Sequence, residues 1–573
     1  MQDAADIPQD LERCQALCRR QAAQLAEQFA QLAEQGSELE KFRKLLSQLV
    51  NGSRSEKRVL SSPDQRWLPF ESDAEFQAAR EEALAEAQAV VETYTVQRQK
   101  RQQKPRQEAL PSCLRREEQI APSPEAIATC PTHGPRTIIG YDTTETLVHK
   151  PAELFVRVTK YPKFACLRAK DCGIASPERP TSLVEGNRFD TSVAVTIVEA
   201  KWFHYLPIYR LQDLFAKSGW IPSRSTLLNI VTQVAFVVGP LVDFMRKKVQ
   251  ADAAVGLDDT SCRMLLPREV PPVQDAKSRR LADKVAEARQ KGQDSLLAKM
   301  WVYSGLVLAP YNIFDFRVSR HRDGPDDFFK NSRCKVQGDC FSGNTSVVLH
   351  SNERLEFVAC WAHARRKVVE AQTYAAEGQL LLGMIQALYD IETRGKILSC
   401  EERLALRQRE STVVLAAIRQ WLDSAPLELV LPKSDFAEAL RYLRNHWEAL
   451  NVYTRDGRIP IDNNSVEQLM KQVALGRKAW LFVGNVAAGE QSATLMSLVS
   501  SAKRHDLDVG VYLKDVLDQL LAGCTDYERL LPDVWKQSHP EAVRVYRVEE
   551  RRDKADRKQF HAAQRRLAAA KPA

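Results

Sequence analysis

The stretch Ala251–Leu266, ADAAVGLDDTSCRMLL, has the pattern of an apolar strand that ends on two adjacent acids, Asp258 and Asp259. Small and apolar residues bounded by polar ones are typical of a strand inside a sheet. Two more strands are expected after it, at Lys299–Leu308 (KMWVYSGLVL) and Asn312–Val318 (NIFDFRV). The sequence therefore predicts a sheet whose first strand ends on carboxylates.

Two shorter strands are expected to complete this sheet. Lys335–Asp339 (KVQGD) also ends on a carboxylate, and Glu356–Cys360 forms the fifth strand. Three strands in succession, followed by crossovers to two more, predict a mixed sheet in an α/β fold. After Cys360 the pattern becomes helical for about eighty residues.

A further carboxylate is expected on a helix that follows the turn Gly457–Asn464 (GRIPIDNN). Asp462 or Asn463 can cap this helix, and Glu467 and Lys471 then lie one turn apart on the same face. Hard divalent ions need several oxygen ligands, and a nearby cation can hold a phosphate. These residues suit a metal-assisted phosphodiester site, although a single acid at a strand end is more often only a solvated terminus.

A helix-turn-helix is predicted upstream, in the segment PIYRLQDLFAKSGWIPSRSTLLNIVTQVAF (207–236). Its first helix, Ile208–Lys217, stops at a Ser-Gly turn, and Ser223 caps the second helix. If the second helix enters a DNA groove, its candidate readers are Ser223, Arg224, Ser225 and Asn229. The alternative is a helical hairpin that does not contact DNA.

A small zinc-binding module is predicted before the helix-turn-helix. Its candidate ligands are Cys130 and His133 from one loop and Cys166 and Cys172 from another. Zinc takes four soft or borderline ligands, usually as two close pairs. The alternative is four unrelated side chains.

The N-terminal region is predicted to be helical. Leu11, Cys18, Leu25, Leu32, Leu39 and Leu46 recur every seventh residue, which indicates either a self-associating coiled coil or one amphipathic helix. Further on, Arg98–Arg106 carries five cations, which suit a solvated linker or a phosphate contact.

The overall composition favours an intracellular protein with several domains. The 573 residues carry a formal net charge of +8 and 12 cysteines, too few for a disulfide-rich scaffold of this length. The longest nearly uncharged apolar run, Val234–Val242, is too short for a bilayer, which needs about 20 residues. No signal peptide is evident, so secreted and membrane classes are not expected.

Several blocks resemble transposases of the insertion sequence 66 family. The most specific are IDNNSVEQLMKQVALGRKAWLFVGN (461–485) and SLVSSAKRHDLDVGVYLKDVL (497–517). CWAHARRK (360–367), GDCFSG (338–343), LDDT (257–260) and the blocks around the helix-turn-helix stand in the family's order. The similarity runs over about residues 40 to 535.

This resemblance implies a ribonuclease-H-like catalytic domain with an Asp-Asp-Glu triad. Carried over block by block, the triad is Asp258, Asp339 and Glu467, which would bind two Mg2+ (or Mn2+) ions. Asp259 is interpreted as a neighbour of the site. A structural Zn2+ ion in the upstream module is also expected.

Other residues take their roles from the same resemblance. Cys360 and His363 form a Cys-x-x-His element that organises the site or contacts DNA, with half a zinc site or plain packing as alternatives. Arg477 and Lys478 are expected to contact phosphates, as is Lys471. Trp480 is expected to pack in the core, with stacking on a DNA base as the alternative.

The predicted domains follow from these blocks. They are a coiled-coil helix (1–50), a helical and basic linker (51–120), a zinc-binding module (121–180), a helix-turn-helix region (181–250), the first part of the ribonuclease-H-like core (251–360), a helical insertion (361–456), the second part of the core (457–535) and a basic tail (536–573).

The expected function is that of a DNA transposase that cleaves its element's terminal inverted repeats and joins them to target DNA. A catalytically inactive DNA-binding repressor and a metal-dependent nuclease without strand transfer are the alternatives. A homo-oligomer, accessory proteins of the same element, no membrane partner, and a location in the bacterial cytoplasm with the nucleoid are also expected.

Overall fold

The computed structural model describes residues 81, 84–95, 129–130, 134–135, 154–156, 164–165, 174–175, 181–183, 189–371, 375–424, 430 and 433–569. These residues belong to two compact units. The larger unit lies within 178–214 and 221–550, and the smaller within 78–177, 215–220 and 551–573. The predicted coiled coil (1–50), the basic segment 98–106 and the side chains of the predicted zinc ligands lie outside the described residues.

The larger unit is built on a five-stranded mixed sheet with the strand order β7-β6-β5-β8-β9. The strands are β5 (Ala254–Leu265), β6 (Ser295–Gly305), β7 (Asn312–Arg317), β8 (Cys334–Gly338) and β9 (Leu355–Ala359). β5, β6 and β7 are antiparallel, whereas β8 runs parallel to both β5 and β9. The predicted mixed α/β sheet is therefore confirmed.

One prediction about this sheet was wrong, because β5 does not end at Asp258 and Asp259. β6 pairs with β5 as far as Leu265, and this long antiparallel ladder keeps the chain extended past the acids. β8 pairs only with Ala254–Gly256 of β5. The two acids therefore lie in mid-strand, just beyond the point where the parallel neighbour stops.

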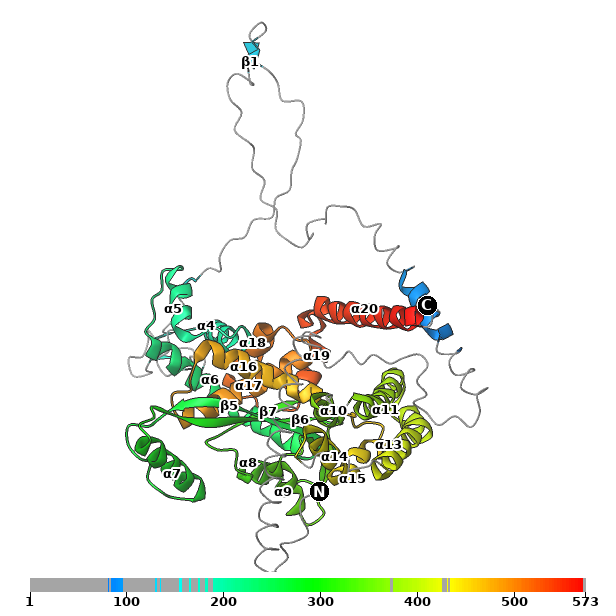
Figure 1. The fold of residues 1–573 in the computed structure, drawn as a ribbon. Coiled ribbons are helices and arrows are strands. Elements are labelled where there is room, and N and C mark those ends of the chain that lie inside the picture. Colours follow the sequence, from blue (N-terminus) through cyan, green and yellow to red (C-terminus); the bar gives the residue numbers. More distant parts are fainter. Residues whose placement is uncertain are drawn as a thin grey trace, which may run out of the picture. The chain divides into compact units, whose positions relative to one another are not determined.

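The free edge of β7 is covered by helix α17 (Val486–Arg504), as Figure 1 shows. Ser501 Oγ accepts a hydrogen bond from the backbone N–H of Asn312 (3.0 Å), and Ser497 Oγ accepts one from that of Phe314 (2.8 Å). Serines four residues apart on a helix thus match N–H groups two residues apart on a strand. This pairing satisfies an edge that would otherwise be open to another chain.

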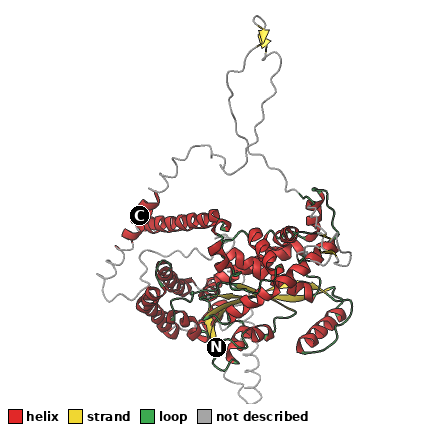
Figure 2. Cartoon of the chain, turned by 180° about the vertical axis from the view of Figure 1, so that it is seen from behind, coloured by secondary structure: helices red, strands yellow, loops and turns green. Residues whose placement is uncertain are grey.

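Helices make up most of the described chain (Figure 2). The other helices are α4 (Thr191–Val198), α5 (Ile208–Ala216), α6 (Arg224–Gln250), α7 (Ala276–Gln290), α8 (Asp323–Phe328), α9 (Ser342–Leu349), α10 (Trp361–Glu370), α11 (Ala375–Gly395), α12 (Cys400–Leu406), α13 (Thr412–Ser424), α14 (Asp435–Asn445), α15 (Trp447–Asn451), α16 (Asn464–Trp480), α18 (Val509–Leu521), α19 (Pro532–Ser538) and α20 (Val545–Ala569). Short π-helical segments at Glu199–Phe203 (η2) and Arg407–Ser411 (η3) continue α4 and α12, and 3-10 segments lie at Val452–Arg455 (η5) and Pro540–Ala542 (η6).

Helices α10 to α15 separate β9 from α16 and share one apolar core. Trp361, Ile385 and Leu443 are among its fully buried residues. The buried guanidinium of Arg407 pairs with the Glu392 carboxylate (2.7 Å) and also donates to backbone carbonyls of η5. A buried charge is tolerated only when it is paired and hydrogen-bonded in this way.

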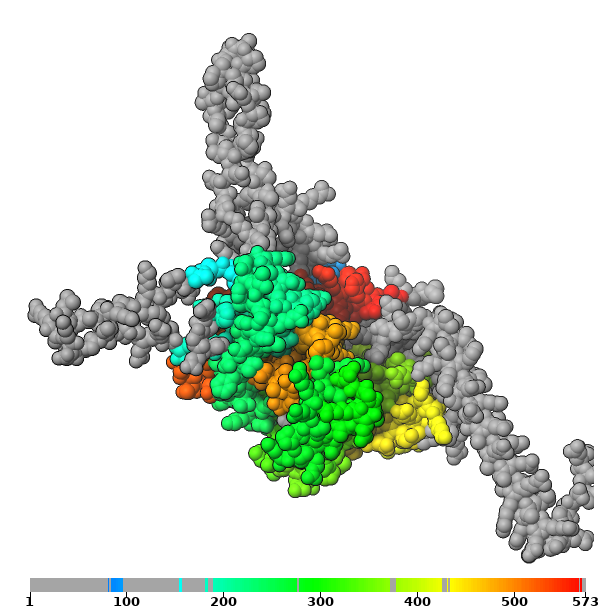
Figure 3. Space-filling model, turned by 90° about the vertical axis from the view of Figure 1, so that its left-hand side faces the viewer, coloured from blue at the N-terminus to red at the C-terminus, as the bar shows by residue number. Residues whose placement is uncertain are grey.

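Helix α6 is long and apolar enough to cross a membrane by length and composition alone. It is instead an element of the protein core, because residues such as Leu227, Val234 and Leu241 are buried against the chain itself. It packs on α17, β6 and β7, and the teal α6 and orange α17 regions lie side by side in Figure 3.

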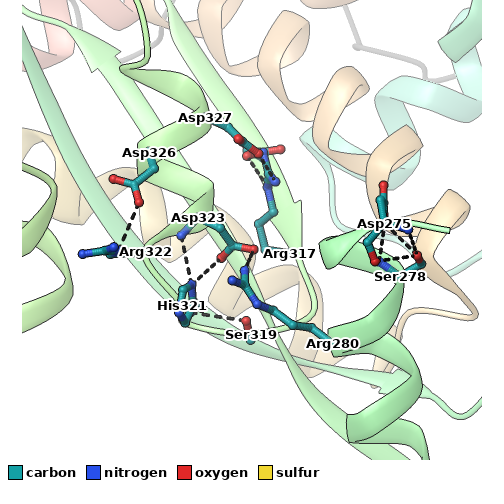
Figure 4. Close-up of polar contacts among 11 residues, drawn as sticks. Asp275, Ser278, Arg280, Arg317, Ser319, His321, Arg322, Asp323, Asp326 and Asp327 are labelled. Carbon is teal, nitrogen blue, oxygen red and sulfur yellow. Dashed lines mark hydrogen bonds and ion pairs between the residues drawn. The ribbon is translucent and has the colours of Figure 1, made fainter. Parts of the chain in front are cut away.

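The charged segment between β5 and β6 contains α7. A capping box between Asp275 and Ser278 starts this helix, and Ala282, Val285 and Ala288 bury one face. The Arg280 guanidinium pairs with Asp323 at the start of α8 (Figure 4). This segment is thus a folded helical element anchored by an ion pair.

The described residues of the smaller unit include two short hairpins and helical segments at 84–95 and 551–569. β1 (Thr129–Cys130) pairs with β2 (Gly134–Pro135), and β3 (Phe164–Ala165) pairs with β4 (Ile174–Ala175). The aromatic rings of Tyr94 and Phe560 stack with their centroids 4.4 Å apart.

Candidate active site

Two of the predicted triad acids lie where the parallel pair β5–β8 ends. Asp258 lies two residues beyond Gly256, the last residue of β5 to pair with β8. Asp339 directly follows Gly338, the last residue of β8. Carboxyl ends of neighbouring parallel strands meet at one edge of a sheet, where ligands of α/β proteins commonly bind. The topology therefore brings these two carboxylates together.

The third acid, Glu467, comes from the first turns of α16, which packs on β5. Its carboxylate lies 3.5 Å from His363 Nδ1 and 3.7 Å from an Arg366 side-chain nitrogen, both on α10. The Glu467 side chain is one quarter exposed, so solvent reaches it. Helix α10 begins the helical region after β9, and α16 follows its end. The two helices thus meet at the Glu467 carboxylate.

Asp339 and Glu467 lie close enough to Asp258 for their charges to act on its carboxyl group. The pKa of Asp258 is raised to about 7, mainly because burial disfavours its charged form. The negative charges of Asp339, Asp259 and Glu467 raise this pKa further, and a hydrogen bond from the Asp259 backbone N–H opposes the shift. A positive ion placed among these carboxylates would relieve both the burial penalty and the repulsion.

Asp259 lies beside this cluster and forms its own ion pairs. Its buried carboxylate lies 2.8 Å from Lys299 Nζ and 2.6 Å from Arg320 Nε. A second nitrogen of Arg320 lies 3.5 Å from Asp339, and the guanidinium stacks over the Phe341 ring. Arg320 thus connects the buried Asp259 carboxylate with Asp339 of the candidate triad.

Asn344 is a site residue that sequence patterns did not identify. Its buried side-chain amide donates a short hydrogen bond to Asp339 Oδ1 and so orients this carboxylate. The sequence gives one indication that Asn344 belongs to the site, which is its position directly after the GDCFSG block. Arg320 and Lys299 carried no such signal, because their partners are distant in the chain.

Cys360 connects the two helices that meet at Glu467. It is the N-cap residue of α10, and its sulfur accepts a hydrogen bond from the backbone N–H of Asn463, the N-cap residue of α16 (3.2 Å). Burial raises the thiol pKa to about 12, so the sulfur stays protonated at neutral pH. The Asn463 side chain donates to the Leu257 carbonyl beside Asp258 (3.0 Å).

Cys360, His363 and Glu467 also place one potential metal-binding atom each within 4.8 Å of the others. A metal ion bound there would occupy the Glu467 carboxylate and so remove it from the acid cluster. We therefore interpret the Cys-x-x-His element as a support for Glu467.

The predicted DNA-binding residues lie on exposed surface. Ser223 caps α6, as expected, by accepting from the Thr226 backbone N–H (3.0 Å). All four candidate readers of α6 are exposed: Ser223, Arg224, Ser225 and Asn229. Lys471, Arg477 and Lys478 are exposed along α16, and Arg477 also donates to Thr260 Oγ1 (3.1 Å). Trp480 contacts the buried Trp202 ring, with centroids 6.4 Å apart.

A mixed sheet that gathers three carboxylates beside exposed cations is typical of metal-dependent enzymes that act on nucleic acids. Residues 186–491 match the family described as Transposase IS66 family. The chain therefore belongs to the IS66 transposase family, whose members share a transposase role, DNA as substrate and a general use of divalent metal.

Three relatives come from Sinorhizobium fredii, and each is described as an uncharacterized protein. Protein y4jD is 32% identical over 73% of this chain and 79% of its own length. Protein y4hP is 26% identical over 88% of this chain and 89% of its own length. Protein y4qI is 26% identical over 94% of this chain and 99% of its own length. The match with these relatives extends beyond the segment shared with the family.

Proposed function

We propose that this chain is a DNA transposase that cuts the terminal inverted repeats of its element and joins the freed ends to target DNA. The observation that carries the proposal is the convergence of Asp258, Asp339 and Glu467 from β5, β8 and α16. The sheet order, with three antiparallel strands followed by two parallel ones, supports a ribonuclease-H-like core.

The three carboxylates fit a pair of Mg2+ or Mn2+ ions. They are hard oxygen donors. The pKa of Asp258 is raised first by burial and then by repulsion from the neighbouring carboxylates, and divalent cations would relieve both. Such ions, when bound, activate the attacking water or hydroxyl and stabilise the leaving oxygen. Asp258, Asp339 and Glu467 would hold them.

The residues around the triad hold these carboxylates in place. Asn344 fixes Asp339, while His363 and Arg366 fix Glu467. Lys471, one turn after Glu467 on the exposed face of α16, would bind a DNA phosphate beside the reacting bond. The same site would serve cleavage and joining, because both displace an oxygen at phosphorus.

We assign end recognition to the regions outside the core. The exposed start of α6 would read the terminal repeats. A zinc ion held by Cys130, His133, Cys166 and Cys172 would stabilise the upstream module, a proposal that the β1–β2 and β3–β4 hairpins support. Pairing of protomers through residues 1–50, accessory proteins of the element, and a location at the bacterial nucleoid belong to the same proposal.

A strand-transfer assay tests this function. The full chain is incubated with Mg2+, a labelled duplex that carries the terminal repeat, and target DNA. Joined products are expected. Cut but unjoined products would instead indicate a nuclease, and repeat binding without any chemistry would indicate a repressor.

His363→Ala is expected to lower the rate of strand transfer about 10- to 100-fold, because residues that orient metal ligands have effects of this size. The substitution removes the imidazole beside Glu467. The Mg2+ concentration for half-maximal activity should rise, while the melting temperature stays close to that of the wild type. A rate loss without any change in Mg2+ dependence would contradict this role.

The stability of the metal-free protein is expected to fall as pH rises from about 4 to about 7. Over this range the unfolded chain releases the Asp258 proton (usual pKa 3.8), whereas the folded protein keeps it until about 7. Mg2+ should therefore raise the melting temperature more at pH 8 than at pH 6. Asp258→Asn should abolish both effects in the same thermal scans. A pH dependence that persists in this variant would exclude Asp258 as its source.

A further inference from the structure

The turn that follows α16 has a strained backbone. Leu481 has φ 71° and ψ −50°, a left-handed conformation that side chains other than glycine rarely adopt. The backbone N–H of Phe482 donates to the Trp480 carbonyl (2.9 Å), which closes a γ-turn of the rare form with positive φ. Strain of this kind persists only where the surrounding structure enforces it.

Hydrogen bonds on both sides hold this turn. The Leu481 N–H donates to the Arg477 carbonyl (2.9 Å) and so attaches the turn to α16. The Val483 N–H donates to the Arg263 carbonyl (2.7 Å), and its carbonyl accepts from the Leu265 N–H (2.9 Å), which attaches the turn to the end of β5. The turn is therefore a rigid element of the fold.

The turn presents two large apolar side chains to solvent. Leu481 is 66% exposed and Phe482 is 49% exposed. Because the hydrogen bonds above fix the backbone of the turn, they also fix the direction in which the two side chains leave it. The strained backbone thus displays an apolar pair that the described part of the chain leaves uncovered.

An exposed, positively charged face of α16 extends from the candidate active site toward Leu481 and Phe482. The exposed residues Asn464, Gln468, Lys471, Leu475 and Lys478 recur at intervals of three and four along α16, so they form one face. These exposed residues include two lysines and no acid. Arg477 is also exposed beside the turn. Such a surface complements the phosphates of a bound nucleic acid.

We propose that Leu481 and Phe482 form a wedge that inserts between two base pairs of the DNA end held in the active site. Apolar side chains presented on a basic surface insert between base steps in this way, and the basic residues offset the cost of unstacking. This inference rests on the transposase function proposed above.

The helix sets the position of the wedge. From Glu467 to Leu481 the chain rises about 21 Å, at about 1.5 Å per residue. Because successive bases of a strand lie about 3.4 Å apart, the wedge would reach a step about six nucleotides from the bond that is cut. An unstacked step at this distance would fix the register of the end relative to the carboxylates.

Fluorescence of 2-aminopurine tests the wedge, because this base brightens when it leaves the stack. The probe is a duplex with the terminal repeat and 2-aminopurine at single positions about four to eight nucleotides from the cut. The full chain carries Glu467→Gln, so that the DNA stays intact. We expect brightening at one position. Adding Phe482→Ala should abolish this signal and weaken binding of the duplex about tenfold. Leu349→Ala, at an exposed leucine of α9, should leave the signal intact.

Four other outcomes would overturn the wedge. Brightening that survives Phe482→Ala excludes the wedge and leaves the proposed function standing. The same holds for a duplex that the Glu467→Gln chain binds without brightening and that the wild type cuts. A Phe482→Ala protein that sediments differently without DNA would identify the pair as a protein contact. Failure of the wild type both to bind and to cut the repeat would instead exclude the proposed function, and the wedge with it.

Discussion

Glu467→Gln is expected to abolish DNA cleavage and strand transfer, with a loss of at least about a thousandfold, because residues that act as one catalytic unit lose most of the activity when any of them is removed. The amide keeps the shape of the side chain but removes the negative charge that a divalent ion requires. Asp258→Asn and Asp339→Asn should lose activity to a similar extent. The measurement is the initial rate of joined product from the labelled terminal repeat.

Binding of the repeat should survive all three substitutions, since the exposed cations and α6 are unchanged. Glu269→Gln and Asp283→Asn are matched controls, because they neutralise exposed acids of the β5–β6 segment outside the cluster. They should retain the wild-type rate. If Glu467→Gln kept its activity, the triad would be wrong. If the wild type were inactive while it bound the repeat, the repressor alternative would be favoured.

The sheet could be predicted from sequence because its strands are short, apolar and separated by polar segments. Asp339 and Glu467 lie next to features with local signals, a strand end and a helix start. The length of β5 could not be predicted in this way. Much of its second half, from Asp259 onward, is polar, and pairing with β6 up to Leu265 and with Val483 keeps it extended. Local patterns do not contain such long-range pairing.

The support of the site could not be predicted either, for a related reason. Arg320 reaches Asp259 and Asp339 from a loop after β7, and Cys360 reaches Asn463 across the whole helical segment. Neither residue type identifies its partner from the sequence alone. The resemblance located the Cys-x-x-His element, but only the fold relates it to Glu467, through His363 Nδ1.

Asp259→Asn is expected to destabilise the larger unit by about 3 kcal/mol, because loss of one partner leaves a largely buried charge unpaired. The Asp259 side chain is 1% exposed and that of Lys299 is 15% exposed, so water cannot replace the lost carboxylate. Arg320, at 34% exposed, contributes less because solvent screens it. The midpoint of urea unfolding, followed by the fluorescence of buried tryptophans such as Trp301, measures the effect.

A second variant distinguishes the cost of an unpaired Lys299 ammonium from that of lost packing. Asp259→Asn combined with Lys299→Met removes the ammonium together with its partner, so it should recover part of the stability lost in Asp259→Asn alone. Asp283→Asn, an exposed acid on α7, should change the midpoint little. Equal losses in the single and double variants would show that Lys299 is not the source of the cost.

Activity gives an independent readout of Asp259→Asn. In this variant the freed Arg320 can pair more closely with Asp339, 3.5 Å away, and compete with the metal ions for this carboxylate. Excess Mg2+ should then restore part of the rate in Asp259→Asn, whereas Asp339→Asn should stay inactive at every Mg2+ concentration.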